Sequence, residues 1–245
     1  MRQWLEATYP VLAAAGAESV AILPLGAVEA HGPHLPVGTD VWISEAMARE
    51  GARLLAARGL AVYVLPSLAY APAPFAADFP GTLSISPQTL TALVAELAHA
   101  LAERGVGTLA LANSHFDPSQ VGALRDAAER VRQAGRPRLV YPDLTRRALA
   151  ERLGEEFRSG ASHAGRFETS ILLAERPELV DERQRAALPA LAVSLTDAMR
   201  SGRNSFRRAG LDAAYCGDPA AASAEEGRDL VARLGEILAE AVLAG

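Results

Sequence analysis

Apolar runs of strand length alternate with long segments of helical period, and this alternation constrains the fold more than any other feature of the sequence. The runs span residues 19–25, 61–65 and 106–112, and a shorter one spans 139–141. Alternating strands and helices are typical of a mainly parallel sheet that is covered by helices on both faces. We therefore predict an α/β fold, a layered single domain over residues 1–245 with a mainly parallel central sheet flanked by helices.

Two helix starts are marked by capping residues. Ser86 and Pro87 supply an N-cap followed by proline at the first helical position, and apolar residues then follow at helical spacing. Ser223 opens a capping box before a final helix with one apolar side. Residues 69–80 and 200–220 lack a regular period, so we predict loops there. Long loops in a compact domain tend to be functional.

Composition excludes several classes of function. The net charge of -5, from 24 basic and 29 acidic residues spread along the chain, predicts neither nucleic acid nor a membrane as a partner. The sequence contains no lysine, which excludes Schiff-base catalysis and a P-loop. Cys216 is the only cysteine, so an intrachain disulfide and a cysteine zinc cage are excluded. Because no signal-peptide core and no membrane-length apolar run are present, we predict a cytoplasmic protein.

Metal-ligand side chains concentrate just after the first apolar run. Glu29, His31, His34 and Asp40 lie within twelve residues, in a chain with only five histidines. Glu29 and His31 are two residues apart, so both side chains point to the same side if the chain is extended there. Asp40 precedes a helical segment, and its carboxylate could reach back toward that side. The simpler interpretation of Asp40 alone is a helix N-cap.

Two later segments carry the same types of side chain. The third apolar run ends in His115 and Asp117, at the carboxyl edge of the predicted sheet, where open α/β folds bind ligands. His163 follows in a glycine-flanked loop, and Glu168 lies at the start of the next predicted helix. Taken alone, these two would be an exposed loop histidine and a first-turn acid. Mixed imidazole and carboxylate ligands suit zinc, manganese or iron, and a bridging carboxylate would hold two ions about 3.5 to 4 Å apart.

The order and spacing of these motifs resemble the creatininase family, also called creatinine amidohydrolases, over most of the chain. The resemblance implies a layered α/β fold, a dinuclear metal-dependent hydrolase of amide or cyclic amide bonds, and commonly a hexamer. The matching segments are residues 25–36 with Thr39 and Asp40, 79–84, 113–115, 163–165 with 168–170, and 217–219.

The resemblance also implies roles for individual residues. His163 matches a histidine that transfers protons near the substrate, and Glu168 matches an acidic residue five positions later, so both are predicted to be catalytic. Asp117 stands where creatininase itself has a glutamate ligand. The implied cofactor is two divalent metal ions, Zn, Mn or Fe, with Asp40 as the bridge. The implied metal ligands are Glu29, His31, Asp40, His115 and Asp117.

Departures from the family pattern concern the substrate rather than the metal. Phe116 replaces a tyrosine, and Ser159 with Gly160 replaces a Trp-Asp pair. Ala76 replaces a histidine that many members carry, and Ser114 replaces a glycine. These changes predict that the pocket has been remade and that creatinine is not the substrate.

We predict a dinuclear amidohydrolase that cleaves a non-peptide or cyclic amide C–N bond of a small molecule. A metal-activated water would attack the carbonyl carbon, and His163 would deliver a proton to the leaving nitrogen. One alternative is a catalytically silent member that binds metal or a ligand, or that acts in assembly. A second alternative is a peptide-trimming maturase. A phosphoesterase is a weaker alternative, because the sequence contains no dedicated phosphate-binding motif. We expect a homo-oligomer, hexameric by resemblance.

Overall fold

A five-stranded parallel sheet forms the centre of the computed structural model, which describes residues 1–135, 137–160 and 162–244. The strand order is β1-β3-β2-β4-β5, and every neighbouring pair is parallel. The predicted α/β class with a mainly parallel sheet is therefore confirmed. The strands are β1 (Arg2–Gln3), β2 (Val20–Leu25), β3 (Val62–Val64), β4 (Thr108–Asn113) and β5 (Arg138–Val140).

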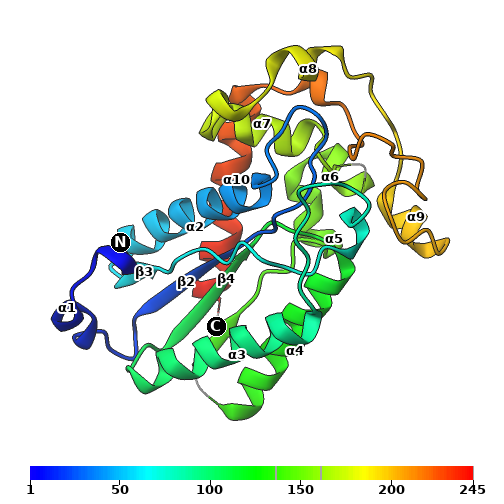
Figure 1. Cartoon of the computed structure of the whole chain (residues 1–245). Coiled ribbons are helices and arrows are strands. Elements are labelled where there is room, and N and C mark those ends of the chain that lie inside the picture. The colour runs from blue at the N-terminus through cyan, green and yellow to red at the C-terminus, as the bar shows by residue number, and fades with distance from the viewer. Residues whose placement is uncertain (136, 161, 245) are drawn as a thin grey trace.

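Long helices cover both faces of the sheet (Figure 1). On one face, α2 (Thr39–Ala57) packs against α10 (Ala224–Leu243), which in turn contacts α7 (Arg166–Glu175). On the other face, α3 (Pro87–Glu103) packs against α4 (Pro118–Ala134). The layers are thus helix, sheet and helix, as the alternation of strands and helices predicts.

The strands are apolar throughout because helices cover both sides of them. In β2, Val20 and Ile22 point into the core that α2, α7 and α10 share. Ala21 and Leu23 point into the opposite core, which α3 and α4 fill. Successive side chains of a strand face opposite sides, so a strand buried on both sides lacks the polar alternation of a surface strand.

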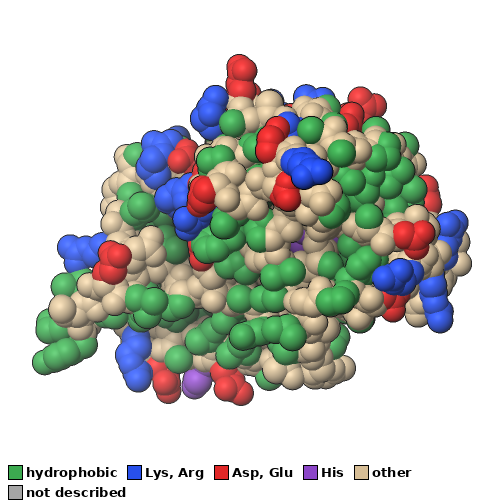
Figure 2. Space-filling view, turned by 45° about the horizontal axis from the view of Figure 1, so that its top comes forward, with side chains coloured by type: hydrophobic (Ala, Val, Ile, Leu, Met, Phe, Trp, Pro, Cys, Tyr) green, Lys and Arg blue, Asp and Glu red, His purple; other side chains and the backbone are tan. Residues whose placement is uncertain are grey.

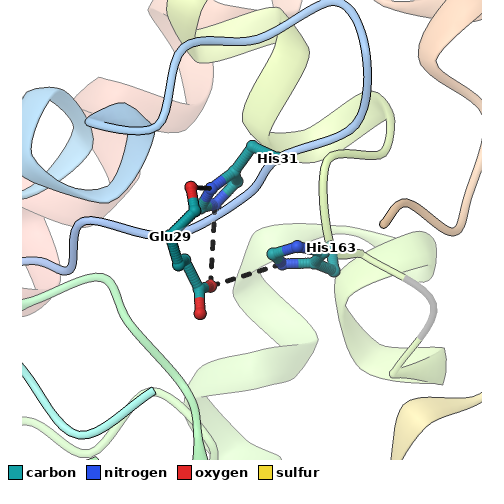
Figure 3. A group of neighbouring side chains, drawn as sticks. All are labelled: Glu29, His31 and His163. Atoms are coloured by element: carbon teal, nitrogen blue, oxygen red, sulfur yellow. Dashed lines mark hydrogen bonds and ion pairs between the residues drawn. The ribbon is translucent and has the colours of Figure 1, made fainter. Parts of the chain in front are cut away.

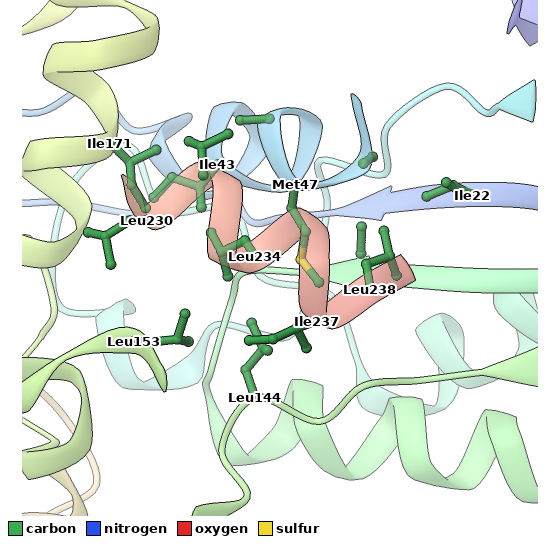
Figure 4. Close-up of a cluster of buried hydrophobic side chains, with 14 of the residues drawn as sticks. Ile22, Ile43, Met47, Leu144, Leu153, Ile171, Leu230, Leu234, Ile237 and Leu238 are labelled. Carbon is green, nitrogen blue, oxygen red and sulfur yellow. The ribbon is translucent and has the colours of Figure 1, made fainter. Parts of the chain in front are cut away.

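Helix α10 fills the first of these two cores (Figure 4). Its Leu234, Ile237 and Leu238 are buried and pack with Met47 of α2. Complete burial of one such side chain contributes about 1.5–3 kcal/mol. This core anchors α2 and α7, the two helices whose first turns carry Asp40 and Glu168.

The two predicted helix starts are confirmed. Ser86 Oγ accepts the backbone N–H of Thr89 at 3.1 Å, at the start of α3. Ser223 Oγ accepts the backbone N–H of Glu226 at 3.2 Å, at the start of α10. The Glu226 carboxylate accepts hydrogen bonds from side chains of α7, so it ties α10 to α7.

The remaining elements are short, and both segments predicted as loops are mostly irregular. Helices α5, α6 and α9 lie beyond the carboxyl ends of β2 and β4 (Figure 1). Within the described residues, no helix is both long enough and apolar enough to span a bilayer. The short elements are η1 (Trp4–Glu6), α1 (Tyr9–Ala13), η2 (Pro74–Ala76), α5 (Arg147–Ala150), η3 (Glu151–Leu153), α6 (Glu155–Ser159), η4 (Pro177–Leu179), α8 (Glu182–Ala187), α9 (Leu195–Arg200) and η5 (Pro219–Ala221).

Candidate metal centre

The candidate site lies where β2 and β4 end side by side. Leu25, the last residue of β2, pairs with Asn113, the last residue of β4. The segments that follow these two strands carry His31 and His115 into the same space. The sequence-based expectation that the two groups meet at one edge of the sheet is confirmed by this register.

Helix α2 brings Asp40 to the same edge. A Cβ at Gly26 would lie 2.5 Å from the backbone nitrogen of Val41, so only glycine lets the chain pass this close to the start of α2. Ser114 Oγ donates to the Asp40 carbonyl at 2.5 Å and ties the helix to the end of β4. Gly38 is the N-cap residue, so the N-cap interpretation of Asp40 is wrong and its carboxylate is available to the site.

The two carboxylate oxygens of Asp40 face two different histidines. Oδ1 lies 3.3 Å from His31 Nε2, and Oδ2 lies 3.0 Å from His115 Nδ1. The three residues are at most 3% exposed. The Asp40 carboxylate therefore lies between the two histidines, with one oxygen toward each.

Two glutamates complete the cluster, one on each side of Asp40. Glu29 Oε1 lies 3.4 Å from His115 Nδ1, and Glu168 Oε2 lies 3.5 Å from His31 Nε2. Among the described residues, the structure contains three groups whose donor atoms lie within 4.8 Å of one another, and Asp40 belongs to two of them. These two are Glu29 with Asp40 and His115, and His31 with Asp40 and Glu168, while the third is Glu29 with His31 and His163.

Three histidines of the site each direct one ring nitrogen to a main-chain carbonyl. Because a carbonyl only accepts, those nitrogens carry hydrogen, and the other nitrogen of each neutral ring presents a lone pair. These second nitrogens face carboxylates, so each such contact needs either a bound metal ion or a second proton on the imidazole ring. The anchoring contacts are His31 Nδ1 with Glu29 O at 3.1 Å, His115 Nε2 with Pro72 O at 2.9 Å, and His163 Nε2 with Ala30 O at 2.9 Å.

Burial and neighbouring charges act against each other on the pKa values of these groups. Burial lowers the pKa of His31, but Asp40, Glu168 and Glu29 outweigh it and raise that pKa to about 10. Glu29 and Asp40 likewise overcome burial and raise the pKa of His115. Burial raises the pKa of the Glu168 carboxyl to about 8, against the opposing effect of His31. Protons thus provide the positive charge that the carboxylates need when no metal ion is bound.

The donor set fits divalent metal ions. His31 Nε2 and Asp40 Oδ2 are buried, and neither makes a hydrogen bond. A bound ion would satisfy these atoms, which would otherwise carry a desolvation cost of about 1–3 kcal/mol each. Nitrogen and oxygen donors in this mixture suit zinc, manganese and iron.

His163 lies beside the cluster and comes from a different part of the chain (Figure 3). Its Nδ1 lies 3.7 Å from Glu29 Oε1, and its ring centroid lies 4.4 Å from that of His31. Phe206 also stacks on the His163 ring, with a centroid distance of 4.3 Å and an interplanar angle of 24°. Burial and the neighbouring His31 hold the pKa of His163 well below its ordinary value, so this ring is neutral near pH 7.

The loop that carries His163 is held in an unusual backbone conformation. Ala164 has a φ of 48°, in the left-handed region that favours glycine. Glu168 accepts the N–H of Ala164 at 2.6 Å, and the His163 carbonyl accepts the N–H of Cys216 at 2.8 Å. Cys216 is buried, which raises the pKa of its thiol to about 12, so this thiol does not act as a nucleophile at neutral pH.

Two residues of the sequence motifs make other contacts. Asp117 is the N-cap of α4, where its carboxylate accepts the N–H of Ser119 at 2.8 Å and the N–H of Phe75 at 3.3 Å. It lines the same cavity as the cluster but belongs to none of the three donor groups. His34 turns toward α7, with Nε2 2.9 Å from Thr169 Oγ1.

A cavity of about 190 Å³ opens onto the cluster. Its wall contains Phe75, Phe116, Phe157 and Phe206, and Arg158 lies at its mouth. No sequence motif contains Phe206 or Arg158. The only indication for Phe206 is its position in residues 200–220, which are predicted to form a long loop. Green apolar side chains predominate over the middle of the face in Figure 2, and histidine shows there only as a small recessed purple patch.

Comparison with known proteins identifies relatives along almost the whole chain. A family model named creatininase, described as creatinine amidohydrolase, matches residues 5–242. A protein named mycofactocin precursor peptide peptidase, from Mycobacterium tuberculosis, is 34% identical over 220 residues, which are 87% of this chain and 80% of that protein. A creatinine amidohydrolase from Pseudomonas putida is 34% identical over 193 residues, with coverages of 73% and 71%.

Solved structures agree with these matches. A structure titled "Creatininase Mn" superposes with a TM-score of 0.73 at 26% identity, over 99% of this chain and 97% of the other. A mutant creatininase described as "Zn-Zn type" gives a TM-score of 0.70 at 25% identity, with the same coverages.

Proposed function

This chain belongs to the creatininase family, and on that premise we propose that it is a dinuclear metal-dependent amidohydrolase acting on a small molecule. Hydrolysis of C–N bonds is the activity of the family, and the proposal adds the number of ions and the kind of substrate. The observation that carries it is the carboxylate of Asp40, which faces one histidine with each oxygen. Each of these histidines has a glutamate of its own nearby.

The two donor groups that share Asp40 would each hold one ion. Glu29 and His115 would bind the first ion and His31 and Glu168 the second, with Asp40 shared between them. In this assignment Glu168 is a metal ligand, whereas the sequence predicted a catalytic role for it. The solved relatives that are named for manganese and zinc forms favour one of these two metals.

Asp117 has a different place in this proposal. Its carboxylate already accepts two backbone N–H groups, and it lies outside both donor groups. We place it in the cavity wall, while its predicted role as a ligand stays a prediction.

Bound divalent ions supply Lewis acidity and a water of lowered pKa, which is the chemistry that amide hydrolysis needs when no nucleophilic side chain is present. His163 handles the proton. Its Nε2–H is committed to the carbonyl of Ala30, so Nδ1, on the side of Glu29, is the nitrogen that accepts and returns a proton. The low pKa of His163 makes its protonated form a good donor to a leaving nitrogen.

The size and wall of the cavity support a small substrate. Its volume of about 190 Å³ is below the ~300–1,000 Å³ of sites for drug-sized ligands. Phenylalanine rings form much of the wall and would exclude water from the reacting bond. Phe116 and the other departures from the creatininase pattern support an amide other than creatinine.

A second candidate function is removal of a residue from the end of a peptide. The relative named mycofactocin precursor peptide peptidase matches a larger share of this chain than the creatinine amidohydrolase does, at the same identity. A cavity of this size would accept one terminal residue and leave the rest of a peptide outside.

Metal-dependent turnover tests the proposal. The protein is stripped with a chelator, reloaded with Mn²⁺, Zn²⁺ or Fe²⁺, and assayed on lactams, cyclic ureas, formamides and short peptides. Hydrolysis of a small amide that returns only with metal supports the proposal, and hydrolysis of peptides alone supports the second candidate. A protein that holds no divalent metal after growth in metal-replete medium contradicts both.

The variant His163→Ala separates an enzyme from a catalytically silent member. His163 also forms a donor group with Glu29 and His31, but each proposed ion keeps its three donors without it, so we expect metal content to persist and turnover to be lost. Unchanged function in the cell despite this substitution would instead favour a binding or assembly role.

We also propose that residues 1–245 act as one domain in a cytoplasmic homo-oligomer, hexameric by family resemblance. Leu5, Tyr9 and Tyr70 are large apolar side chains that lie exposed on the chain, and subunit contacts would cover them. Light scattering on the purified protein measures the number of subunits, and a monomer at micromolar concentration would contradict this proposal.

A further inference from the structure

We propose that Arg158 binds a carboxylate of the substrate at the mouth of the cavity, so that the substrate is a small amide with a negative charge away from the scissile bond. This inference rests on the proposed function, because it takes the bound ions as the other end of the site. To the proposed function it adds two points: Arg158 as a residue that determines specificity, and a negative charge on the substrate.

The charges around the cavity are unevenly distributed. Arg158 is the one arginine among the described residues that line it, and its side chain is 54% exposed. The acidic residues of the lining are all buried. They are Glu29, Asp40, Asp117 and Glu168. A ligand that reaches from the buried end to the mouth therefore meets the metal ligands first and a single guanidinium last.

The guanidinium of Arg158 is available to a ligand. Its ion-pair partner is Glu155, at 3.5 Å, and the side chain of Glu155 is 88% exposed. Exposed pairs of this kind contribute only about 0–1 kcal/mol, so Arg158 can turn to a better partner at little cost. By contrast, Arg166 of α7 lies 2.6 Å from Glu226 and is committed to holding two helices together.

The backbone around Arg158 is well supported. The carbonyl of Gly160 accepts the N–H of Leu195 at 2.9 Å, which joins the end of α6 to the start of α9. Phe157 packs edge to face on Phe116 at 5.1 Å, inside the aromatic wall. Arg158 thus follows a buried anchor and precedes a fixed turn, which holds its Cα at the rim.

The bound ions determine whether an anion can enter. Without them, the buried end holds four carboxylates, and only protons on the neighbouring groups offset their charge. Two divalent ions add four positive charges, which offset these four carboxylates and also hold the other end of the substrate. The preference for a charged substrate is therefore measured in the metal-loaded protein.

Hydroxamates with and without a carboxylate test the inference without requiring the natural substrate. A hydroxamate binds divalent metals through two oxygens, so it anchors one end of the probe in the site. The charged probes are the monohydroxamates of malonic, succinic and glutaric acid, and the neutral probes are hydroxamates of the same lengths that end in a methyl group. Calorimetry on Mn²⁺- or Zn²⁺-loaded protein measures the dissociation constants.

We expect at least one charged probe to bind about 10-fold or more tightly than its neutral partner, as a charge-assisted hydrogen bond predicts. In Arg158→Gln this ratio should fall to about 1. The control Arg147→Gln removes an arginine whose side chain is 90% exposed and which does not line the cavity, and it should keep the full ratio.

The possible results separate this inference from the function on which it rests. Equal binding of charged and neutral probes by the native protein, or a ratio that survives in Arg158→Gln, overturns the role of Arg158 and leaves the metal centre intact. Failure of all hydroxamates to bind the loaded protein contradicts the metal centre and this inference together.

Discussion

The metal end of the cavity and its outer wall are built from different structural elements. His31 and His115 closely follow two neighbouring central strands, and Asp40 and Glu168 lie in the first turns of well-packed helices. The wall comes from the short helices α6 and α9 and from irregular residues such as Phe206. Bond cleavage and substrate choice can therefore vary separately, because the wall can be rebuilt without moving the residues of the metal end.

The largest effect should follow from Asp40→Asn. Removing the shared charge should release at least one ion and lower kcat/KM by at least about 100-fold, since even residues that only support ligands cost 10–100-fold. Elemental analysis and turnover with an amide identified in the panel measure the two effects. Asp126→Asn, an exposed position of α4, is the matched control and should change neither. Full metal content in Asp40→Asn would contradict a metal-binding role of Asp40, and with it the division of the cavity into a metal end and a wall.

Metal removal should destabilise the protein, and more so at higher pH. In the stripped protein the raised pKa values, about 10 for His31 and about 8 for Glu168, stabilise the fold through protonated forms. That stability is lost as pH rises from the ordinary values of 6.5 and 4.5 through these raised values.

Metal binding has the opposite pH dependence because the ligands must be deprotonated. The melting-temperature difference between loaded and stripped protein should therefore widen from pH 6.5 to 9. At 100 times Kd the metal adds about 2.7 kcal/mol. A difference that shrinks over this range would contradict the assigned ligands.

Asp117→Asn tests whether Asp117 belongs to the metal end of the cavity or to its wall. Asparagine caps helices about as well as aspartate, so the start of α4 should persist. We expect two bound ions per chain and only a small change in turnover, because asparagine keeps the size of the side chain and still accepts the backbone N–H of Ser119. Loss of one ion, measured by elemental analysis, would show that Asp117 is a ligand, as its place in the family pattern predicts.

Phe206→Ala should lower turnover without changing the metal content. Loss of the ring that stacks on His163 should lower kcat by about 10-fold, because small displacements of a proton-transferring group reduce the rate. It should also destabilise the fold by about 3–5 kcal/mol. Phe79→Ala changes the same cluster without touching His163, so it should leave kcat within about 2-fold. Equal losses of kcat in both variants would rule out a positioning role for Phe206.

The smallest effect concerns Cys216, which lies behind the His163 loop. Burial and a thiol pKa of about 12 should protect it from a thiol-specific chromogenic reagent at pH 8 in the native protein. Denaturant should expose one thiol per chain. Rapid labelling of Cys216 without denaturant would contradict this expectation, because it would show that the cavity wall opens far enough to expose the loop that carries His163.

The sequence predicts the metal end of the site better than its wall, for physical reasons. Strands buried on both faces are apolar throughout, and parallel strands end at one edge, so the meeting of His31 with His115 could be predicted. Asp40 was open to two interpretations, because a first-turn acid and an N-cap differ by only two positions here.

Other features depend on contacts that local patterns do not encode. The position of the Glu168 carboxylate depends on a turn in which Ala164 has a positive φ, a conformation that alanine rarely adopts. The stacking of Phe206 on His163 depends on an irregular segment folding back over the site. The two-residue strand Arg2–Gln3 has no apolar pattern and forms through its pairing with β3.

Anomalous diffraction from crystals of the metal-loaded protein tests the central claim most directly. Data on either side of the manganese or zinc absorption edge locate each ion independently of the protein atoms. We expect two peaks on either side of the Asp40 carboxylate, one beside Glu29 and His115 and the other beside His31 and Glu168. A single peak, or two peaks that do not share Asp40, would contradict the dinuclear centre.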